Sequence, residues 1–449
     1  MMGTLPSQQN ALFYDFCLEK HVARNHLLRQ IDQFLDFDQI RVYLAPYYSH
    51  TGRPSIDPEL MVRMLLIGYC YGIRSERRLC EEVNYNLAYR WFCRLGLEEE
   101  VPNHSSFSKN RHGRFRESDL FRQVFSTIVE QCITIGLVEG EGFAVDASYV
   151  KADASRGHAV ENDERVGWTP KVVNSRAVRE YVDALDKQPE LRRRQKRISL
   201  SDPMSQWTAA KGAAIYAYST NYVIDIQNNI IMDVEASPSI RTLEVNKARV
   251  MIDRIESNYG IKPKRLLGDT AYGDAENLNY LLNEKGIEPH IPVWERQHRK
   301  DGTFLVEEFI WDESENVYIC PANNRLRTKG RTNADNRIRY RASQSDCDRC
   351  IYKKQCCPTD RARKIARNRY ESAREKTRLI TQSSRYKKSF HERKKVEMVF
   401  AHMKRDIKLE RLRLRGLSGA NDEFILAATA QNLRRMAKLS IRPPPHSRQ

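Results

Sequence analysis

Long hydrophobic runs are absent from this chain of 449 residues. No segment has the ~18 apolar residues that a membrane-spanning helix needs. The longest candidate, residues 61–73, is interrupted by Arg63. The N-terminus also lacks a basic stretch followed by an apolar core, so we expect no signal peptide. These absences argue against a membrane protein and favour a cytoplasmic one.

Several common catalytic patterns are missing as well. The eleven histidines form no pair at the helical spacing that metal sites use. The chain has no glycine-rich phosphate loop, and its Ser, His and Asp residues do not follow a hydrolase order. Nucleotide-binding and triad-based enzymes are therefore poor candidates.

Positive charge is abundant. The net charge is +17 and the pI is about 9.4, which indicates a polyanionic partner. Residues 361–415 contain 20 Lys and Arg against 6 Asp and Glu. A hydrophobic content of 41% supports sizeable cores. We expect a protein that acts on the chromosome of a cell without a nucleus, or one imported through its basic segments.

Two aspartates follow apolar stretches that are typical of strands. Residues 142–148, within a first strand expected at 141–153, read as a strand that ends on Asp146. Residues 265–273 place Asp269 in the same way. Aspartate is a poor strand residue, but at a strand end it projects into the crevice where α/β sheets bind ligands. A single such aspartate would more commonly cap a helix or form an Asx turn.

A third acid, Glu397, lies in a predicted basic helix. The spacing Arg-x3-Glu-x6-Lys puts Arg393, Glu397 and Lys404 within roughly 40° of one another on a helix. A separate apolar stripe runs beside them: Val396, Val399, Phe400, Met403 and Ile407. A carboxylate between two cations suits a metal ligand in a site that handles nucleic acid. A salt-bridged, solvated helix face is the simpler alternative.

The three acids together are more informative than any one of them. Asp146, Asp269 and Glu397 follow one another in the order strand, strand, helix. Three carboxylates can hold two Mg²⁺ ions ~4 Å apart and support in-line attack on a phosphodiester. We therefore interpret them as the catalytic residues of a metal-dependent phosphoryl-transfer enzyme.

The N-terminal region, residues 1–135, is expected to be helical. Asp57-Pro58 is a helix start signal, and residues 75–89 read as a second helix. Asn103 then begins a basic helix that carries Lys109 and Arg111. Short helices that end in a basic one resemble a helix-turn-helix DNA reader. A helical bundle used for dimerisation explains the pattern equally well.

Cysteines cluster in an expected insertion at residues 294–385. The pair Cys347-x2-Cys350 fits a tetrahedral Zn²⁺ site. Cys320 would supply another ligand, and either Cys356 or Cys357 would complete the set. Reduced, partly exposed thiols are the alternative, because ten cysteines in a cytosolic chain argue for thiols or metal rather than disulfides.

The motif around Glu397 resembles the Tyr-x2-Arg-x3-Glu-x6-Lys signature of bacterial insertion-sequence DDE transposases. Phe390 replaces the tyrosine, which removes a hydroxyl contact but leaves a stacking surface, and Tyr386 lies one turn earlier. Asp146 and Asp269 resemble the first and second catalytic acids of that family. The segment 52–94 resembles its N-terminal helical domain, and the cysteine-rich insertion resembles one found in a subgroup.

The resemblance implies an α/β protein with an RNase H-like catalytic domain. Its first part would span residues 136–293 and its last part residues 386–440, with the insertion before the last catalytic helix. The enzyme would use two Mg²⁺ or Mn²⁺ ions to cut and join DNA at the inverted-repeat ends of its own element. We expect it to bind terminal and target double-stranded DNA as a homodimer or a larger assembly.

Two other functions remain open at this point. A nuclease of the same fold would cut DNA without joining strands, and the metal site would be common to both. A non-catalytic DNA-binding regulator on this scaffold would not need the three acids, which are all present.

Overall fold

The chain divides into two compact units in the computed structural model. The first unit comprises residues 1–140, 144–261 and 394–449, and the second comprises residues 141–143 and 262–393. The structure describes residues 16–48, 51, 55–161, 175–187, 195–209, 212–295 and 302–440. Within these ranges no helix is both long enough and apolar enough to cross a membrane.

The first unit begins with short helices, as expected. Asp57 caps α4 by accepting a hydrogen bond from the amide of Glu59 at 2.8 Å, and Pro58 occupies the first helical position. The helix expected at residues 75–89 is split at Asn86, which ends α5 and caps α6. These elements are α1 (Leu18–His21), α2 (Leu27–Asp32), α3 (Asp38–Leu44), η1 (Ala45–Tyr47), α4 (Pro58–Cys70), α5 (Glu76–Tyr85), α6 (Leu87–Phe92), α7 (His104–His112), α8 (Arg114–Glu117) and α9 (Leu120–Thr134).

The strands of the first unit follow these helices. β5 and β6 form a hairpin: they pair antiparallel, with Tyr222 opposite Val234, and Asn229 adopts a positive φ of 56° in the turn. β5 lies between β1 on one side and both β4 and β6 on the other. The elements are β1 (Phe143–Lys151), β2 (Ala159–Glu161), α11 (Arg176–Lys187), β3 (Arg197–Ser199), β4 (Gln206–Thr208), β5 (Ile215–Asp225), β6 (Ile231–Pro238) and α13 (Arg241–Tyr259).

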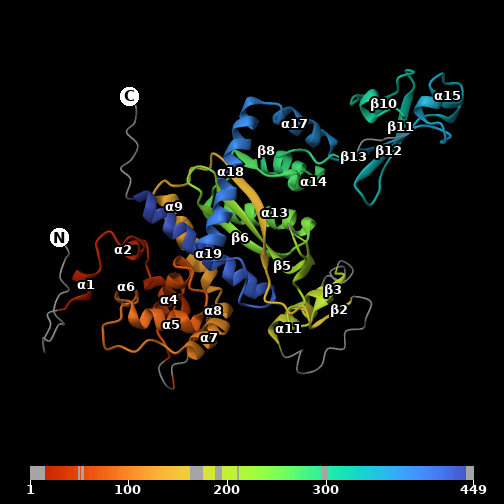
Figure 1. Ribbon diagram of the computed structural model, residues 1–449. Helices are drawn as coiled ribbons and strands as arrows, with labels where there is room; N and C mark the ends of the chain where they lie inside the picture. Colours follow the sequence, from red (N-terminus) through yellow and green to blue (C-terminus); the bar gives the residue numbers. More distant parts are fainter. Residues whose placement is uncertain are drawn as a thin grey trace, which may run out of the picture. The chain divides into compact units, whose positions relative to one another are not determined.

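The C-terminal helix α19 (Gly416–Ser440) holds the first unit together. It packs against β6, α4 and α9 (Figure 1). The Asn432 side chain accepts from the amide of Ile231 at 2.9 Å and donates to its carbonyl at 2.8 Å. Because these bonds satisfy buried backbone groups of β6, they fix the helix along this strand.

The second unit begins with a parallel strand pair. β7 (Arg265–Leu267) pairs with β8 (Glu288–His290), with Leu266 opposite Pro289. β8 begins two residues after Gly286, which ends the intervening helix at a positive φ of 66°. Helix α17 packs against β8 and α14 (Figure 1). The helices are α14 (Ala275–Asn279), a π-helical turn η3 (Tyr280–Lys285) and α17 (Glu371–Thr381).

The second unit also contains a five-stranded antiparallel sheet. Its buried side is aromatic: Tyr340 lies edge-on to Trp311 and Tyr318, with ring centroids 5.4 Å and 5.3 Å away. Such edge-to-face contacts stabilise a small core beyond the area they bury. The elements are η4 (Val306–Glu308), β9 (Ile310–Asp312), β10 (Val317–Ile319), β11 (Arg325–Thr332), β12 (Arg337–Arg341), α15 (Gln344–Asp348), α16 (Lys353–Cys356) and β13 (Lys364–Asn368).

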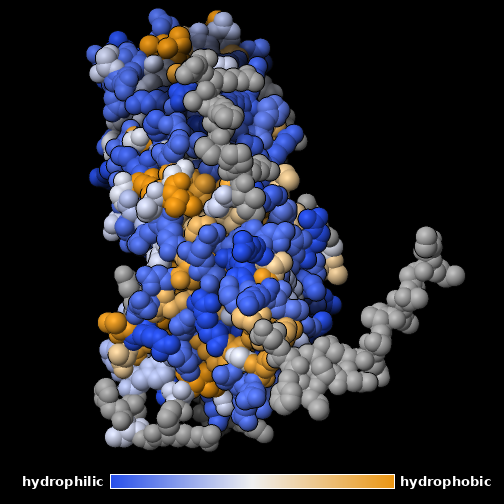
Figure 2. Space-filling view, turned by 90° about the vertical axis from the view of Figure 1, so that its left-hand side faces the viewer, coloured by the Kyte–Doolittle hydropathy of each residue, from blue (hydrophilic) through white to orange (hydrophobic). Residues whose placement is uncertain are grey.

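The surface is mainly hydrophilic. Figure 2 shows blue side chains over most of the visible face, with hydrophobic residues in scattered groups. The charged composition of the chain, 30% Asp, Glu, Lys and Arg, is consistent with this surface.

Candidate functional site

Helix α18 (Ser384–Arg405) carries Glu397. Val396, Val399 and Met403 are buried, with 0%, 3% and 2% exposure, whereas Glu397 is exposed. The predicted amphipathic pattern is therefore confirmed. Arg393 and Lys404 are half-buried, so this face of the helix presents a carboxylate between two cations.

The N-terminal half of α18 is anchored to β7 and β8 within the second unit. Arg265 on β7 donates to the Glu392 carboxylate at 2.8 Å and also to the hydroxyl of Ser389. Ser389, 1% exposed, is 2.6 Å from Nδ1 of His290 on β8. Burial lowers the pKa of His290, and Glu288 acts in the opposite direction. The part of α18 up to Glu392 is thus fixed to β7 and β8.

Asp146 lies inside β1, not at its end. The strand continues five residues further, to Lys151, so the expectation of a strand that ends on this acid is wrong. Asp146 is half-buried, and one of its oxygens accepts from the amide of Ala147 at 2.8 Å. At the far end of the strand, Lys151 donates from its amide to Glu410 at 3.1 Å and accepts from Leu412 at 2.8 Å.

These backbone bonds have a consequence for Glu397. The segment that contains Glu410 and Leu412 directly follows α18, and all of these residues belong to the first unit. The strand that carries Asp146 is therefore paired with the chain that leaves the helix carrying Glu397. Because hydrogen-bonded backbone is rigid, it restricts how far the two acids can move relative to each other.

Asp269 follows β7 by two residues, as expected. Its carboxylate accepts from the amide of Ala271 at 2.7 Å and caps η2 (Thr270–Tyr272), a short 3₁₀ helix. A Cβ atom at Gly273 would lie 2.0 Å from the carbonyl oxygen of Pro292. Only glycine fits there, so Gly273 lets the chain after Asp269 pack closely against the chain after β8.

No group of three or more His, Cys, Asp or Glu side chains in the described ranges is already arranged to hold a metal ion. Asp153, another acid close to the end of β1, forms ion pairs with Arg411 at 2.7 Å and Arg415 at 3.0 Å. These two ion pairs give Asp153 a structural role that does not require a metal ion.

The two N-terminal DNA-binding candidates differ in exposure. Lys109 on α7 is exposed. Arg111 is 6% exposed, pairs with Glu76 at 3.0 Å and donates to the Tyr69 hydroxyl at 3.1 Å. This position does not suit a phosphate contact, and we assign Arg111 a structural role between α4, α5 and α7.

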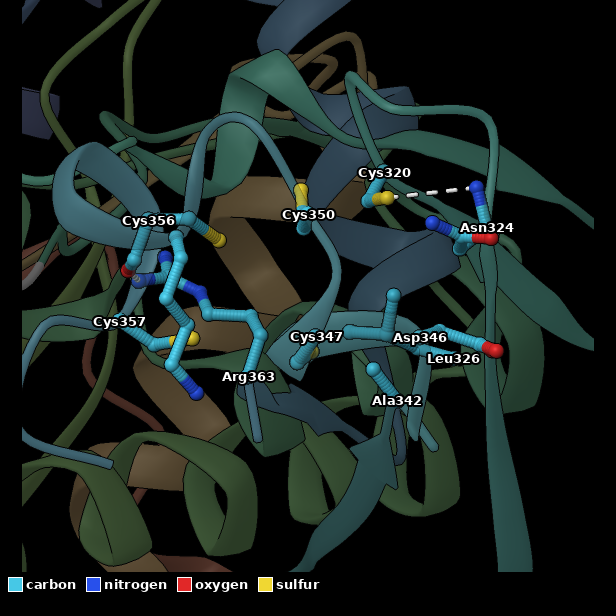
Figure 3. A pocket seen from close by; sticks show the side chains of 11 residues that line it. Cys320, Asn324, Leu326, Ala342, Asp346, Cys347, Cys350, Cys356, Cys357 and Arg363 are labelled. Carbon is cyan, nitrogen blue, oxygen red and sulfur yellow. Dashed lines mark hydrogen bonds between the residues drawn. The ribbon is translucent and has the colours of Figure 1, made fainter. Parts of the chain in front are cut away.

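The five cysteines of the second unit surround one small cavity (Figure 3). Its volume is about 20 Å³, enough for roughly one atom-sized guest. Burial raises the pKa of Cys356 to about 12, and the neighbouring thiols of Cys357 and Cys347 act in the same direction. Asn324 donates from its amide to the Cys320 sulfur at 3.3 Å. Cys357, which the sequence left as an alternative, thus lines the same cavity as the four predicted ligands.

Two comparisons with known families decide the identity of the chain. Residues 16–113 match a family described as Transposase domain (DUF772). Residues 319–437 match a family described as Transposase DDE domain. The chain is an insertion-sequence DDE transposase. No solved structure matches it.

The transposase is therefore an enzyme of a family that depends on divalent metal ions. The DDE match includes Glu397, Arg393 and Lys404 as well as the cysteines, whereas Asp146 and Asp269 lie outside both matched ranges. Sequence reasoning missed the anchoring residues Arg265, Ser389 and His290, since nothing in their local sequence signals a contact about 100 residues away.

Proposed function

We propose that the transposase cleaves and joins DNA at the inverted-repeat ends of its own insertion sequence, with Asp146, Asp269 and Glu397 as catalytic acids. The observation that carries this proposal is helix α18. It exposes Glu397 between Arg393 and Lys404 while the apolar stripe beside them is buried, and it lies inside the matched DDE range. A solvated salt-bridged face would not need anchoring to β7 and β8.

An RNase H-like arrangement fits the strands of each unit. The first unit has β6, β5 and β1 side by side, with β5 and β6 antiparallel. The second has the parallel pair β7 and β8, followed by the cysteine-rich sheet and then α18. The β5–β6 hairpin precedes the parallel pair β7 and β8, with Asp146 on β1 and Asp269 two residues after β7. This order of strands and acids supports an RNase H-like fold. The position of the cysteine-rich sheet between β8 and α18 supports an insertion before the last catalytic helix.

The donor set fits divalent cations. Carboxylate oxygens are the ligands that Mg²⁺ and Mn²⁺ prefer, and Asp146, Asp269 and Glu397 would hold two such ions. The ions would activate the attacking oxygen and stabilise the leaving oxygen of the phosphodiester. The protein's own contribution is to fix each acid: Asp146 within a strand, Asp269 on a capped turn and Glu397 on an anchored helix.

The cations on α18 would position the DNA. Arg393 and Lys404 lie on the same face as Glu397 and would bind phosphates beside the scissile bond. The Phe390 side chain, 51% exposed, offers a ring for stacking on a DNA base. Lys109 on α7 would contribute to recognition of terminal DNA, which the enzyme would bind as a dimer or larger assembly.

Alanine substitutions test the three acids. Asp146→Ala, Asp269→Ala and Glu397→Ala should each abolish Mg²⁺-dependent cleavage of terminal DNA and leave DNA binding nearly intact, because phosphate contacts do not depend on these acids. Asp153→Ala is the matched control and should still cleave. A wild-type rate for any of the three variants would show that this acid is assigned wrongly.

Product analysis separates the transposase from a nuclease of the same fold. Wild-type protein with Mg²⁺, terminal DNA and a target plasmid should give joined products as well as cut ends. Cut ends alone, under conditions in which both DNA molecules are bound, would favour the nuclease.

We also propose that the cysteine cavity binds one structural Zn²⁺. Thiolates of four of the five cysteines suit tetrahedral zinc, and the small aromatic core beside them would gain stability from such a link. Binding requires the sulfur atoms to move inward and lose their protons. Lys353 and Arg363 line the cavity, and their charge favours thiolates.

Elemental analysis tests the zinc proposal. Purified protein should contain about one Zn²⁺ per chain, and Cys347→Ser/Cys350→Ser should lose it and melt at a lower temperature. Cys17→Ser, which changes an exposed cysteine elsewhere, is the control and should keep the metal. Metal-free wild-type protein with the same melting temperature as the double variant would rule the site out.

A further inference from the structure

The sheet formed by β11, β12 and β13 has two unlike faces. Leu326, Tyr340 and Ile365 point into the aromatic core, with exposures of 0%, 2% and 2%. Because side chains alternate along a strand, the residues next to them face the other way. These neighbours are mainly cations, and they define a cationic face: Arg325, Arg327, Arg339, Arg341 and Lys364.

Strand register brings cations of this face directly opposite one another. Arg327 on β11 is the partner of Arg341 on β12, and Arg341 is the partner of Lys364 on β13. All three are exposed. Like charges directly opposite on neighbouring strands destabilise a sheet. A row of three therefore lowers the stability of the free protein, and the cost points to a function for the row.

Few acids neutralise the cationic face. Residues 325–341 contain seven Lys and Arg but one acid, Asp335. Glu315 pairs with Arg325 at 3.7 Å and Asp360 with Lys364 at 3.3 Å, both at the margins of the face. Within the described ranges Arg327, Arg339 and Arg341 form no ion pair.

An arginine on the opposite face of the same sheet behaves differently. Arg367 on β13 pairs with Glu375 at 2.9 Å, donates to the Tyr318 hydroxyl at 3.1 Å and lies 4.1 Å from the centre of the Trp311 ring. Arg367, on the core side of the sheet, thus has an acidic partner, whereas Arg327, Arg339 and Arg341 on the outer side form no ion pair within the described ranges. An ordinary solvated surface would mix both signs of charge.

The hairpin between β11 and β12 extends the same charge. The register shifts between Thr328 and Thr332, and Gly330 adopts a positive φ of 70° there. Such a bulge re-aims side chains. Lys329 and Arg331, on either side of Gly330, are exposed, so two further cations project near the row.

We propose that the cationic face binds the phosphate backbone of double-stranded DNA independently of sequence. The proposal rests on the proposed function, because it takes the transposase's DNA as the ligand. Neighbouring strands lie about 5 Å apart, so flexible Arg and Lys side chains of one row can reach successive phosphates. Arginine forms bidentate bonds to phosphate. Phosphate contacts position DNA without reading its bases.

The test is the salt dependence of binding to a random duplex. Arg327→Gln/Arg341→Gln should flatten the log–log slope of affinity against salt by about two, since each lost phosphate contact contributes roughly 0.9. The same shift should appear on terminal DNA. The melting temperature should stay the same or rise, because the substitution removes like-charge repulsion.

A matched control separates this face from net charge. Arg78→Gln/Arg349→Gln removes the same charge from exposed positions outside the sheet and should leave the slope nearly unchanged. An unchanged slope for the Arg327/Arg341 variant, or an equal loss in the control, would overturn the proposal. If wild-type protein binds and cleaves terminal DNA in that case, the proposed function stands. If the slope is flattened in the Arg327/Arg341 variant but wild-type protein shows no Mg²⁺-dependent cleavage, the proposed function is contradicted. The proposal that the cationic face binds DNA would still stand.

Discussion

Arginines of the first unit and arginines of the cationic face are used in opposite ways. In the first unit, Arg63 pairs with Asp32 at 2.6 Å, Arg111 with Glu76 at 3.0 Å and Arg122 with Asp233 at 2.6 Å. On the cationic face, Arg327 and Arg341 stand opposite each other. Both regions look basic in the sequence. The net charge of +17 therefore does not reveal where positive charge is available to DNA, because burial and partners decide that.

The largest effect that the comparison predicts is on stability. Arg111→Met should lower the free energy of unfolding by about 1–3 kcal/mol, because it removes the partner of the half-buried Glu76 carboxylate and of the Tyr69 hydroxyl. Arg341→Gln should leave the free energy of unfolding unchanged within error. Urea denaturation of the full chain, followed by circular dichroism, compares the two. Equal stabilities for both variants would remove the distinction between structural and available arginines.

A smaller effect is expected on helix α18. Arg393→Ala and Lys404→Ala should each flatten the salt dependence of DNA binding by about one unit and should also lower cleavage, because the scissile phosphate must be positioned for in-line attack. Arg405→Ala is the control, because Arg405 lies on the same helix, is exposed and pairs with Asp406 at 2.9 Å. If neither Arg393→Ala nor Lys404→Ala changes the slope of log affinity against log salt concentration, this face of the helix is only a solvated, salt-bridged surface.

Local signals in the sequence predicted many elements well. The start of α4 followed from Asp57-Pro58, and the start of α7 followed from Asn103. The apolar stripe of α18 followed from its spacing, because burial on a helix depends on residues three and four positions apart. The family resemblance rested on the same local motifs, and the family matches confirm it.

Features that depend on distant partners were not predictable. Arg111 was predicted to contact DNA because it lies in a basic helix. Its partner Glu76 is 35 residues away in the sequence, so no local pattern indicated the ion pair. The five-stranded sheet was missed because β11 reads as a charged stretch with few apolar positions. The bridge between Lys151, at the end of β1, and Arg411, beyond α18, is a contact that no local pattern indicates. The three acids were chosen from local sequence, and their joint role stays a prediction.

Glu397→Gln tests the central claim most directly, because it keeps the size and hydrogen-bonding capacity of the side chain and removes only the negative charge. Binding and Mg²⁺-dependent cleavage of one terminal duplex should be measured in the same preparation. The account predicts wild-type binding with a loss of cleavage to background, since a neutral amide is a poor ligand for a divalent ion. Cleavage by Glu397→Gln at the wild-type rate would contradict the account.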